Sequence, residues 1–473
     1  MTETASTTGS WRELLGAKYL GTSVVLAGGV ALYATNEFLT SSLLPNTVAE
    51  IGGSRLYAWV TTLYLVGSVV AATLVSPMLV RFGARASYLT GLAVFGVASL
   101  VCGMAPDIGV LIAGRALQGV AGGLLAGLGY AVINTALPRV LWTRAAALVS
   151  AMWGVATVVG PATGGLFAQL GLWRWAFVAM AILTALVAML VPIALPAGRV
   201  DPGGAAPKIP VWSLLLLGAA ALAVSVAQLP RNVAATIGLL AAAAVLVGLF
   251  LIVDWRMPAT VLPPSVFGPG PLKWLYLTMA VMMIGAMVTT YVPLFGQRLA
   301  HLTPLTAGFL GAALALGWTV SEIVSASLDN PRTIARVIAG APMVMAAGLA
   351  LGAATQRDNA SIGIVALWAL ALLVAGIGIG GAWPHLSVRA MDTVNDPSEG
   401  GVAAAAINTV QVISGAFGAG VAGVVVNNAE NRTSSDLSDL VAARWLFAVF
   451  AVVGALGVVA SYRASNGATR DGR

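Results

Sequence analysis

Residues 33–45, YATNEFLTSSLLP, end a run of apolar residues that begins near Leu20. The run is long enough to cross a bilayer, which requires ~20 residues at ~1.5 Å of rise each. A carboxylate, Glu37, nevertheless lies inside it. A charged side chain within a membrane costs about 2.5–3.5 kcal/mol on insertion scales, and such residues normally face a bundle interior or a water-filled path. The stretch therefore predicts a membrane-spanning helix with a carboxylate that faces other helices.

The whole chain has the composition of a polytopic membrane protein. Of its 473 residues, 59% are hydrophobic and only 9% are charged, whereas a soluble domain carries about a quarter charged residues. No small-residue cleavage site follows a short apolar core at the amino terminus, so we expect an uncleaved first span. The basic residues are scattered, which argues against nucleic-acid binding. The single cysteine, Cys102, provides neither an internal disulfide nor a zinc cluster.

Fourteen apolar segments are predicted to span the membrane as helices. Lys and Arg residues divide 16 to 7 between the two sets of loops and helix ends, so both termini are expected in the cytoplasm. The two middle segments carry no charge, which indicates six-helix lobes at 1–196 and 272–473, separated at 197–271 by a cytoplasmic linker and a peripheral helix pair. The predicted spans are 20–44, 56–80, 87–105, 109–137, 146–168, 175–195, 212–229, 233–253, 272–296, 304–328, 334–354, 360–387, 401–427 and 443–462.

Only three of the 24 basic and 17 acidic residues lie well inside these spans: Glu37, Arg115 and Glu322. One hypothesis is an internal Glu–Arg pair that only fixes helix packing. The other is a proton or cation site that lines a cavity. Two carboxylates in opposite halves of the chain favour the cavity.

Helical spacing places polar groups on shared faces in four predicted spans. Thr40 or Ser41 follows Tyr33 and Glu37 on one face, and Ser325 follows Trp318 and Glu322 on another. The third face carries Arg115 and Gln118, and the fourth carries Asn408 and Gln411. Amide side chains such as these are also explained as hydrogen-bonding contacts between helices. Candidate contacts for an aromatic, amphipathic substrate are Tyr33, Asn36, Tyr64, Gln118, Trp153, Tyr291, Trp318, Trp383, Asn408 and Gln411.

Glycine and proline mark a possible gate in GVATVVGPATGG, residues 154–165. Pro161 removes a backbone hydrogen bond in mid-helix. Gly160, Gly164 and Gly165 allow another helix to approach closely. Static packing and a moving contact between helices both remain open on this pattern alone.

The same segment resembles the antiporter motif of the major facilitator superfamily. LIAGRALQG, residues 111–119, resembles that superfamily's fourth-helix motif, whose arginine (here Arg115) is tied to proton coupling. NEFLTSSLLPNTVAEIG, residues 36–52, is similar to the first-helix motif of its drug exporters. With LPPSVF (262–267) and LTPLTAG (302–308), the chain resembles the 14-spanner drug–proton antiporters over nearly its whole length. It is most similar to mycobacterial efflux proteins associated with fluoroquinolones.

One motif departs from the family pattern. In SPMLVRFGAR, residues 76–85, Ser76 and Val80 stand where the superfamily usually has glycine and aspartate, while Arg81 and Arg85 remain. The resemblance implies a gate that uses these arginines without the aspartate. In the carboxyl half, Asp329 would have the equivalent role.

We therefore expect proton-driven export of amphipathic or cationic small molecules. In this hypothesis Glu37 exchanges the proton, Arg115 adjusts its proton affinity, and Glu322 is a second proton or cation site. The protein is expected to be a monomer in the plasma or inner membrane, in contact with lipids, with no cofactor, metal or catalytic machinery. Export of a lipid or metabolite, and a membrane-embedded sensor or scaffold, remain as alternatives.

Overall fold

The computed structural model describes residues 10–72, 74–195, 209–230, 232–394, 396, 399–432 and 437–466. Every regular element in these ranges is a helix and none is a strand, so the predicted all-α membrane fold is confirmed. Most of the predicted linker, residues 196–208, lies outside the described ranges. So do Arg199, Lys208, Arg231, Arg470 and Arg473, which all contributed to the orientation argument.

The amino-terminal half forms one bundle of long helices. The second predicted span is interrupted between α3 and α4, and Gly83 leaves the helical conformation inside α4 with φ 76°, where a loop was predicted. Glycine tolerates this positive φ because it has no Cβ. The elements are α1 (Trp11–Leu14), α2 (Leu20–Ile51), η1 (Ser54–Leu56), α3 (Tyr57–Ala72), α4 (Val75–Gly103), α5 (Ile108–Ala131), α6 (Ile133–Ala136), η2 (Arg139–Leu141), α7 (Trp142–Gln169) and α8 (Trp173–Ala194).

The remaining helices form a separate pair and a second bundle. The predicted span 272–296 is divided into two helices by a 3₁₀ turn, η4. The elements are α9 (Val211–Val226), α10 (Val233–Arg256), η3 (Pro264–Phe267), α11 (Leu272–Ala286), η4 (Met287–Thr290), α12 (Val292–Ala300), α13 (Pro304–Ser325), α14 (Pro331–Thr355), α15 (Ile362–Asp392), α16 (Gly400–Arg432) and α17 (Ser438–Asn466).

The helix lengths fit fourteen spans. Eleven helices in the described ranges are long and apolar enough to cross a membrane. Three further predicted spans correspond to α2, which has 32 residues and carries the polar groups around Glu37, and to α3 and α9, which have 16 residues each. The chain is therefore a multi-pass membrane protein.

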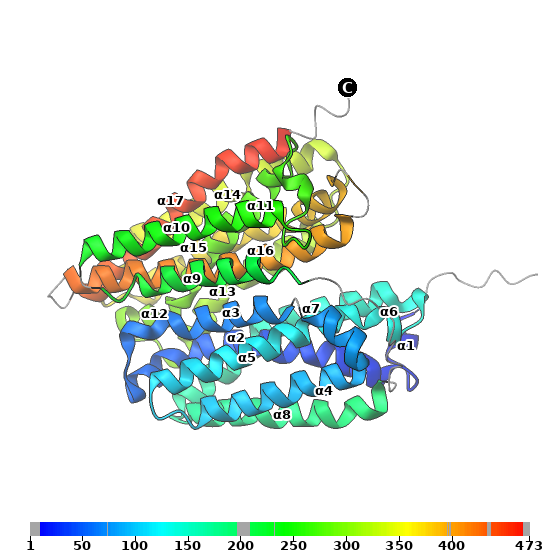
Figure 1. Ribbon diagram of the computed structural model, residues 1–473. Helices are drawn as coiled ribbons and strands as arrows, with labels where there is room; N and C mark the ends of the chain where they lie inside the picture. The colour runs from blue at the N-terminus through cyan, green and yellow to red at the C-terminus, as the bar shows by residue number, and fades with distance from the viewer. Residues whose placement is uncertain are drawn as a thin grey trace, which may run out of the picture.

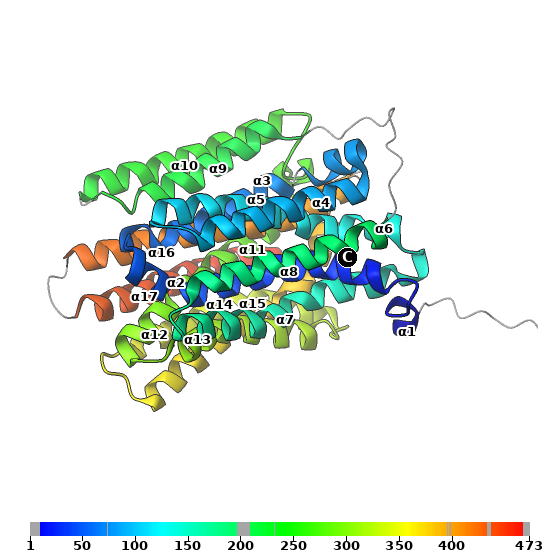
Figure 2. The ribbon, with the colours of Figure 1, turned by 90° about the horizontal axis from the view of Figure 1, so that it is seen from below.

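Two bundles lie one above the other in Figure 1, with α2–α8 below and α11–α17 above. They meet where α7 packs against α13 and where α3 packs against α16. Helix α1 and the last turn of α17 lie at the same end of the molecule (Figure 1), which we call the α1 end. The opposite end, where α2 finishes, we call the Glu50 end. The α9–α10 pair runs along one side of both bundles (Figure 2).

Close backbone approach determines how the amino-terminal bundle packs around Arg115. A Cβ added at Gly119 or Gly123 of α5 would collide with the backbone of Tyr64 or Ser68 on α3. Small residues at such positions let membrane helices gain van der Waals contact over a long interface. Arg115, one turn before Gly119, is thereby held against α3.

The α9–α10 pair differs from its prediction in one respect, because it carries a buried charge. Helix α10 continues to Arg256 and includes Asp254, which is completely buried. The carboxylate accepts hydrogen bonds from the amides of Val261 (2.8 Å) and Leu262 (2.9 Å). Charge-assisted bonds of this kind offset the cost of burial. The prediction of a helix pair without charges is thus wrong for the last turn of α10, which lies beyond the predicted end of the span. Asp254 fixes the loop that leads from this turn to η3.

Candidate functional site

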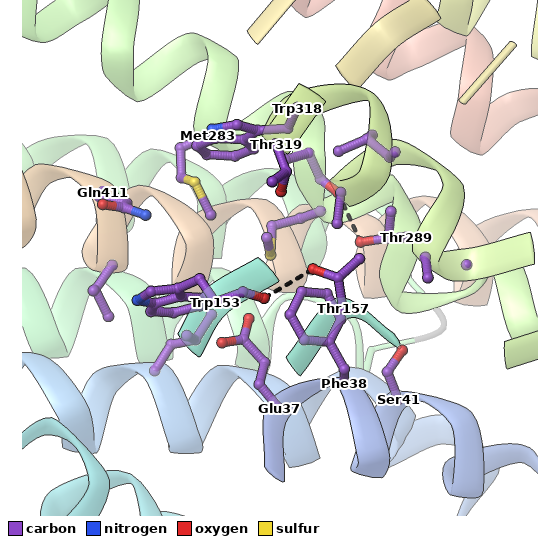
Figure 3. A pocket seen from close by; sticks show the side chains of 18 of the residues that line it. Glu37, Phe38, Ser41, Trp153, Thr157, Met283, Thr289, Trp318, Thr319 and Gln411 are labelled. Carbon is purple, nitrogen blue, oxygen red and sulfur yellow. Dashed lines mark hydrogen bonds between the residues drawn. The ribbon is translucent and has the colours of Figure 1, made fainter. Parts of the chain in front are cut away.

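A cavity of about 570 Å³ lies between the two bundles. Helices α2, α3, α5 and α7 line one side, and α11, η4, α13, α15 and α16 line the other. Each side contributes one carboxylate, Glu37 from α2 and Glu322 from α13. Figure 3 shows the cavity with aromatic, hydroxyl and thioether side chains around it. Such a mixture of apolar wall and few polar groups is typical of small-molecule sites.

The Glu37 side chain rises from α2 into the cavity, between Trp153 and Phe38 (Figure 3). No hydrogen bond or ion pair to Glu37 occurs among the described residues. The nearby Thr157 hydroxyl donates its hydrogen to the Trp153 carbonyl at 3.0 Å and therefore does not donate to Glu37. Glu37 is therefore accessible to a ligand or to protons that enter the cavity.

Arg115 is 1% exposed and is held by neutral groups. Its guanidinium donates to Gln118 Oε1 at 3.0 Å and to the Val60 carbonyl at 3.4 Å. It also lies 3.9 Å from the centre of the Tyr64 ring, which is a cation–π contact. Gln118 in turn donates to Ser99 Oγ at 2.8 Å. The direct Glu–Arg ion pair, one of the two hypotheses from the sequence, does not form in this conformation.

Stacked aromatic rings lie beside Arg115 at the wall of the cavity. The rings of Tyr64 and Tyr33 stack with centroids 5.4 Å apart, and Trp153 meets Tyr33 edge-on at 5.7 Å. The Tyr64 hydroxyl donates to the Tyr33 carbonyl at 2.8 Å. Tyr33 and Trp153 line the cavity, whereas Tyr64 lies behind them. Arg115 is itself one of the lining residues, so its positive charge acts on the cavity directly, beside these rings.

Glu322 occupies an aromatic corner of the other lobe. The Trp318 indole donates to Glu322 Oε2 at 2.9 Å, and the Trp318 ring packs against Trp383 with centroids 5.1 Å apart. One turn further along α13, Ser325 Oγ lies 2.9 Å from His385 Nε2 of α15. The two carboxylates thus differ: Glu37 has no partner in the described structure, and Glu322 has an indole donor.

The cavity is closed at the Glu50 end and open at the α1 end. At the closed end Ser42 is 1% exposed and packs against Gly308 of the other lobe, and beyond them the buried rings of Tyr57 and Tyr291 stack at 4.7 Å. The lining residue Tyr130, near the α1 end, is 42% exposed. At the same end, but within the amino-terminal lobe, Glu50 of α2 pairs with Arg174 of α8, whose guanidinium holds the pKa of the Glu50 carboxyl below its usual range.

The predicted gate segment places its glycines at two different contacts. A Cβ on Gly160 would lie 2.5 Å from Cβ of Phe38, and one on Gly164 would lie 3.0 Å from Cα of Leu39, both on α2. A Cβ on Gly165 would lie 2.5 Å from Cα of Leu305, on α13 of the other lobe. The segment therefore packs within its own lobe and also across the lobe interface.

The remaining candidates from the sequence are distributed between the cavity, the core and the surface. Gln411 and Pro161 line the cavity. Asn36 and Gln118 are completely buried behind it, Tyr291 belongs to the closed end, and Asn408 is exposed outside the lining. Of the candidate gate charges, Arg81 and Asp329 are exposed and Arg85 is partly buried.

Several lining residues were not identified from the sequence. Met283 and Met287 face the cavity where α11 gives way to η4, and Thr289 and Thr290 follow them. Methionine adapts its shape to varied apolar partners. The one feature of the sequence that could have indicated Met283 and Met287 is their spacing of four residues, which places them on one face of a helix. The break in the helix, which aims the two threonines inward, has no signal in the sequence that we can name.

Comparisons with known proteins agree with this architecture. The model of the Major Facilitator Superfamily matches residues 26–419. A probable multidrug-efflux transporter of Mycobacterium tuberculosis is 71% identical over 471 residues, which cover 98% of each chain. The puromycin resistance protein of Streptomyces alboniger is 29% identical over 438 residues, which cover 89% of this chain and 84% of that protein.

Solved structures show the same fold at low sequence identity. A bacterial homologue of the human lysosomal transporter Spinster gives a TM-score of 0.68 at 14% identity, over 96% of this chain and 99% of that one. A D-xylose–proton symporter gives 0.62 at 17% identity, over 93% and 97%. The family model covers well over half of the chain, and the bundles, the cavity and the motifs agree with it. The chain belongs to the Major Facilitator Superfamily.

Proposed function

We propose that the protein exports amphipathic small molecules in exchange for protons, by alternating access to the cavity between its lobes. The observation that carries this proposal is the pair of carboxylates, Glu37 and Glu322, that enter one aromatic-lined cavity from opposite lobes. A carboxylate buried in a membrane protein is costly and normally marks a proton or ion path. The name of the 71% identical mycobacterial relative, a probable multidrug-efflux transporter, supports the same function.

Glu37 is the proposed coupling group. Because no side chain in the described structure is bonded to it, its carboxylate is free to take up and release a proton as the cavity alternates between the two sides. Arg115, fixed by Gln118 and Tyr64, places a constant positive charge at the wall of the same cavity. Both charged residues line the cavity without forming an ion pair in the described structure, so Glu37 remains exchangeable.

The cavity suits amphipathic substrates of drug size. Trp153, Trp318 and Trp383 offer flat apolar surfaces, and Met283 and Met287 adapt to different shapes. Glu322 supplies a negative charge for cationic substrates. Candidate substrates are therefore aromatic compounds that are neutral, zwitterionic or cationic.

The proposed transport cycle uses the two bundles as moving lobes, 1–196 and 272–473, with residues 197–271 as an insert. We place both termini in the cytoplasm of a cell whose plasma or inner membrane holds the protein, so that the open α1 end faces inward. One chain forms the complete cavity, so a monomer is sufficient. Repeat-built transporters of this kind alternate by rocking one half against the other around a midplane site.

The test uses inverted membrane vesicles that contain the protein. An inside-acid gradient should drive uptake of a fluorescent drug, and a protonophore should abolish that uptake. Vesicles without the protein provide the background. Uptake that survives the protonophore would contradict proton coupling, and the absence of uptake for neutral, zwitterionic and cationic compounds alike would contradict drug export.

A further inference from the structure

The carboxyl end of α9 lies in the seam between the two lobes at the Glu50 end. Helix α9 packs against α3 of one lobe and α16 of the other, while α10 packs on α9 from outside (Figure 2). No residue of either helix lines the cavity. The pair is thus outside the substrate site, but α9 touches both moving parts.

Asn427 of α16 is the centre of a polar junction in this seam. Its side chain is 3% exposed, and Nδ2 donates to the Arg55 carbonyl at 2.9 Å and to Gln228 Oε1 at 3.3 Å. Gln228, just beyond α9, is completely buried and donates Nε2 to the Ser225 carbonyl at 2.8 Å. One asparagine therefore links the carboxyl-terminal lobe to the amino-terminal lobe and to the inserted helix.

Two further contacts connect the same end of α9 to the amino-terminal lobe. The Trp59 indole of α3 donates to the Ser225 carbonyl at 3.1 Å. The guanidinium of Arg55 donates to the Leu229 carbonyl. The junction is therefore bonded from both lobes, and it ends at backbone carbonyls that α9 leaves unpaired where it stops.

Close packing accompanies the hydrogen bonds. A Cβ added at Gly423 of α16 would collide with the Gln228 side chain and would lie 2.9 Å from Cβ of Ala58 on α3. The absence of a side chain at Gly423 thus lets three elements meet at one point. Any larger residue there would separate the lobes at the Glu50 end.

We propose that Arg55, Trp59, Gln228 and Asn427 form a latch, the α9 latch, that holds the lobes together at the Glu50 end and releases when the cavity opens there. The inference rests on the proposed alternating access. In the closed state Asn427 donates to Arg55 and Gln228, while the Trp59 indole and the Arg55 guanidinium donate to carbonyls at the end of α9. On opening, water replaces these partners, so the latch sets the balance between the two states without contacting substrate.

Removing the Asn427 amide should disfavour the closed state selectively. Gln228 Oε1, which is completely buried, and the Arg55 carbonyl would then lose their donor, whereas in the open state water would satisfy both. The variant loses two bonds, and the loss of even one of them should raise the population open at the Glu50 end by roughly three- to tenfold. Asn428 is a matched control, because its Nδ2 donates at 2.8 Å to the Val424 carbonyl of its own helix.

The experiment measures distances between spin labels by pulsed electron resonance on purified full-length protein. Labels at Gln169→Cys and Asp358→Cys, both exposed on opposite lobes at the Glu50 end, report opening there. Labels at Arg139→Cys and Ser327→Cys report closing at the α1 end. Cys102 is completely buried and should not react with the label.

We expect Asn427→Ala to increase the population of longer distances at the Glu50 end and the population of shorter distances at the α1 end. Asn428→Ala should give the wild-type distributions. Gly423→Ala, a wedge that removes no hydrogen-bonding group, should shift both pairs in the same direction, while Gly238→Ala on α10, where a Cβ meets nothing within 4 Å, should not.

Identical distributions for Asn427→Ala and Asn428→Ala would overturn the latch. This result would leave the proposed function standing, provided that the wild-type protein shows both states when pH and substrate are varied. A wild type that never opens at the Glu50 end would overturn alternating access and the latch together. A broadening of both distributions without a shift would indicate that the variant is merely less stable, and would also overturn the latch.

Discussion

Glu37 differs from every other buried charge described here in having cavity space around it and no bonded partner. Replacement by Gln keeps the shape and polarity but removes the exchangeable proton. Glu37→Gln should therefore abolish gradient-driven uptake in inverted vesicles, reducing it to that of vesicles without the protein, while the melting temperature and substrate binding remain close to wild type. Both binding and transport should be measured on the same preparation. Transport at the wild-type rate would exclude Glu37 as the coupling group.

The proposed role of Arg115 depends on the planar shape of its guanidinium group. The group contacts Gln118, the Val60 carbonyl and the Tyr64 ring at the same time, and an ammonium cannot reproduce this geometry. Arg115→Lys should keep the charge but lose at least one of these contacts, so transport should fall and its dependence on pH should move. An unchanged rate and pH profile would mean that charge alone is required.

Glu322 is expected to distinguish between substrates. Its carboxylate is held by the Trp318 indole next to the Trp383 ring, an arrangement that favours an organic cation over a neutral molecule. Glu322→Gln should weaken export of a permanently cationic dye by about tenfold or more, the equivalent of ~1.4 kcal/mol, and should affect a neutral compound much less. Equal losses would make Glu322 a second coupling residue, and no loss for either compound would make it structural.

At the scale of single elements, three of the four glycines in the α7 segment 154–165 should have separable effects. Gly164→Ala pushes α7 against the Leu39 backbone inside one lobe, so it should lower stability by about 1–3 kcal/mol, as overpacking does. Gly165→Ala pushes against Leu305 of the other lobe, so it should disturb transport more than stability. Gly154→Ala is the control, because its Cβ would lie an ordinary 3.7 Å from Thr319 Cγ2.

Thermal unfolding and vesicle transport, measured on all three variants, provide the comparison. If Gly164→Ala and Gly165→Ala lose stability and transport to the same extent, the α7 segment has a packing role only. Wild-type stability and wild-type transport in Gly165→Ala would contradict the close contact across the lobe interface.

The sequence predicts the elements better than it predicts their contacts. The period of α2 predicts Tyr33, Glu37 and either Thr40 or Ser41 on one face. In the structure Tyr33, Glu37 and Ser41 line the cavity, whereas Thr40 is buried outside the lining. The same argument applied to α16 pairs Asn408 with Gln411, yet only Gln411 reaches the cavity. Helical spacing defines a face, but the neighbours of that face depend on tertiary packing.

The α9 seam illustrates the same limit. Ser225 and Gln228 are recognisable from the sequence as polar residues in an apolar helix end. Their partners Trp59 and Asn427 lie at least 166 residues away along the chain. Nothing in the local pattern joins such distant positions. The partners of Asp254 are near in the chain, at Val261 and Leu262, but the hydrogen bonds depend on how the following loop folds back onto the helix end.

At the scale of the whole molecule, the closed Glu50 end offers a site for locking the proposed cycle. Ser42 of α2 and Gly308 of α13 belong to opposite lobes, and a Cβ built on Gly308 would lie 3.0 Å from Cβ of Ser42. Disulfides join Cβ atoms about 3.5–4.5 Å apart, so a small adjustment would allow one to form. Cys102 is buried elsewhere and should not compete.

The double variant Ser42→Cys/Gly308→Cys should form a disulfide on mild oxidation and lose transport, because the lobes can no longer separate at that end. Reduction should restore transport, and the two single variants should be insensitive to oxidant. Substrate binding from the open α1 end should persist in the oxidised protein, because the cross-link holds the conformation described here. Transport that continues at the full rate in fully cross-linked protein would show that the lobes need not part at the Glu50 end, and the alternating-access cycle would then be wrong.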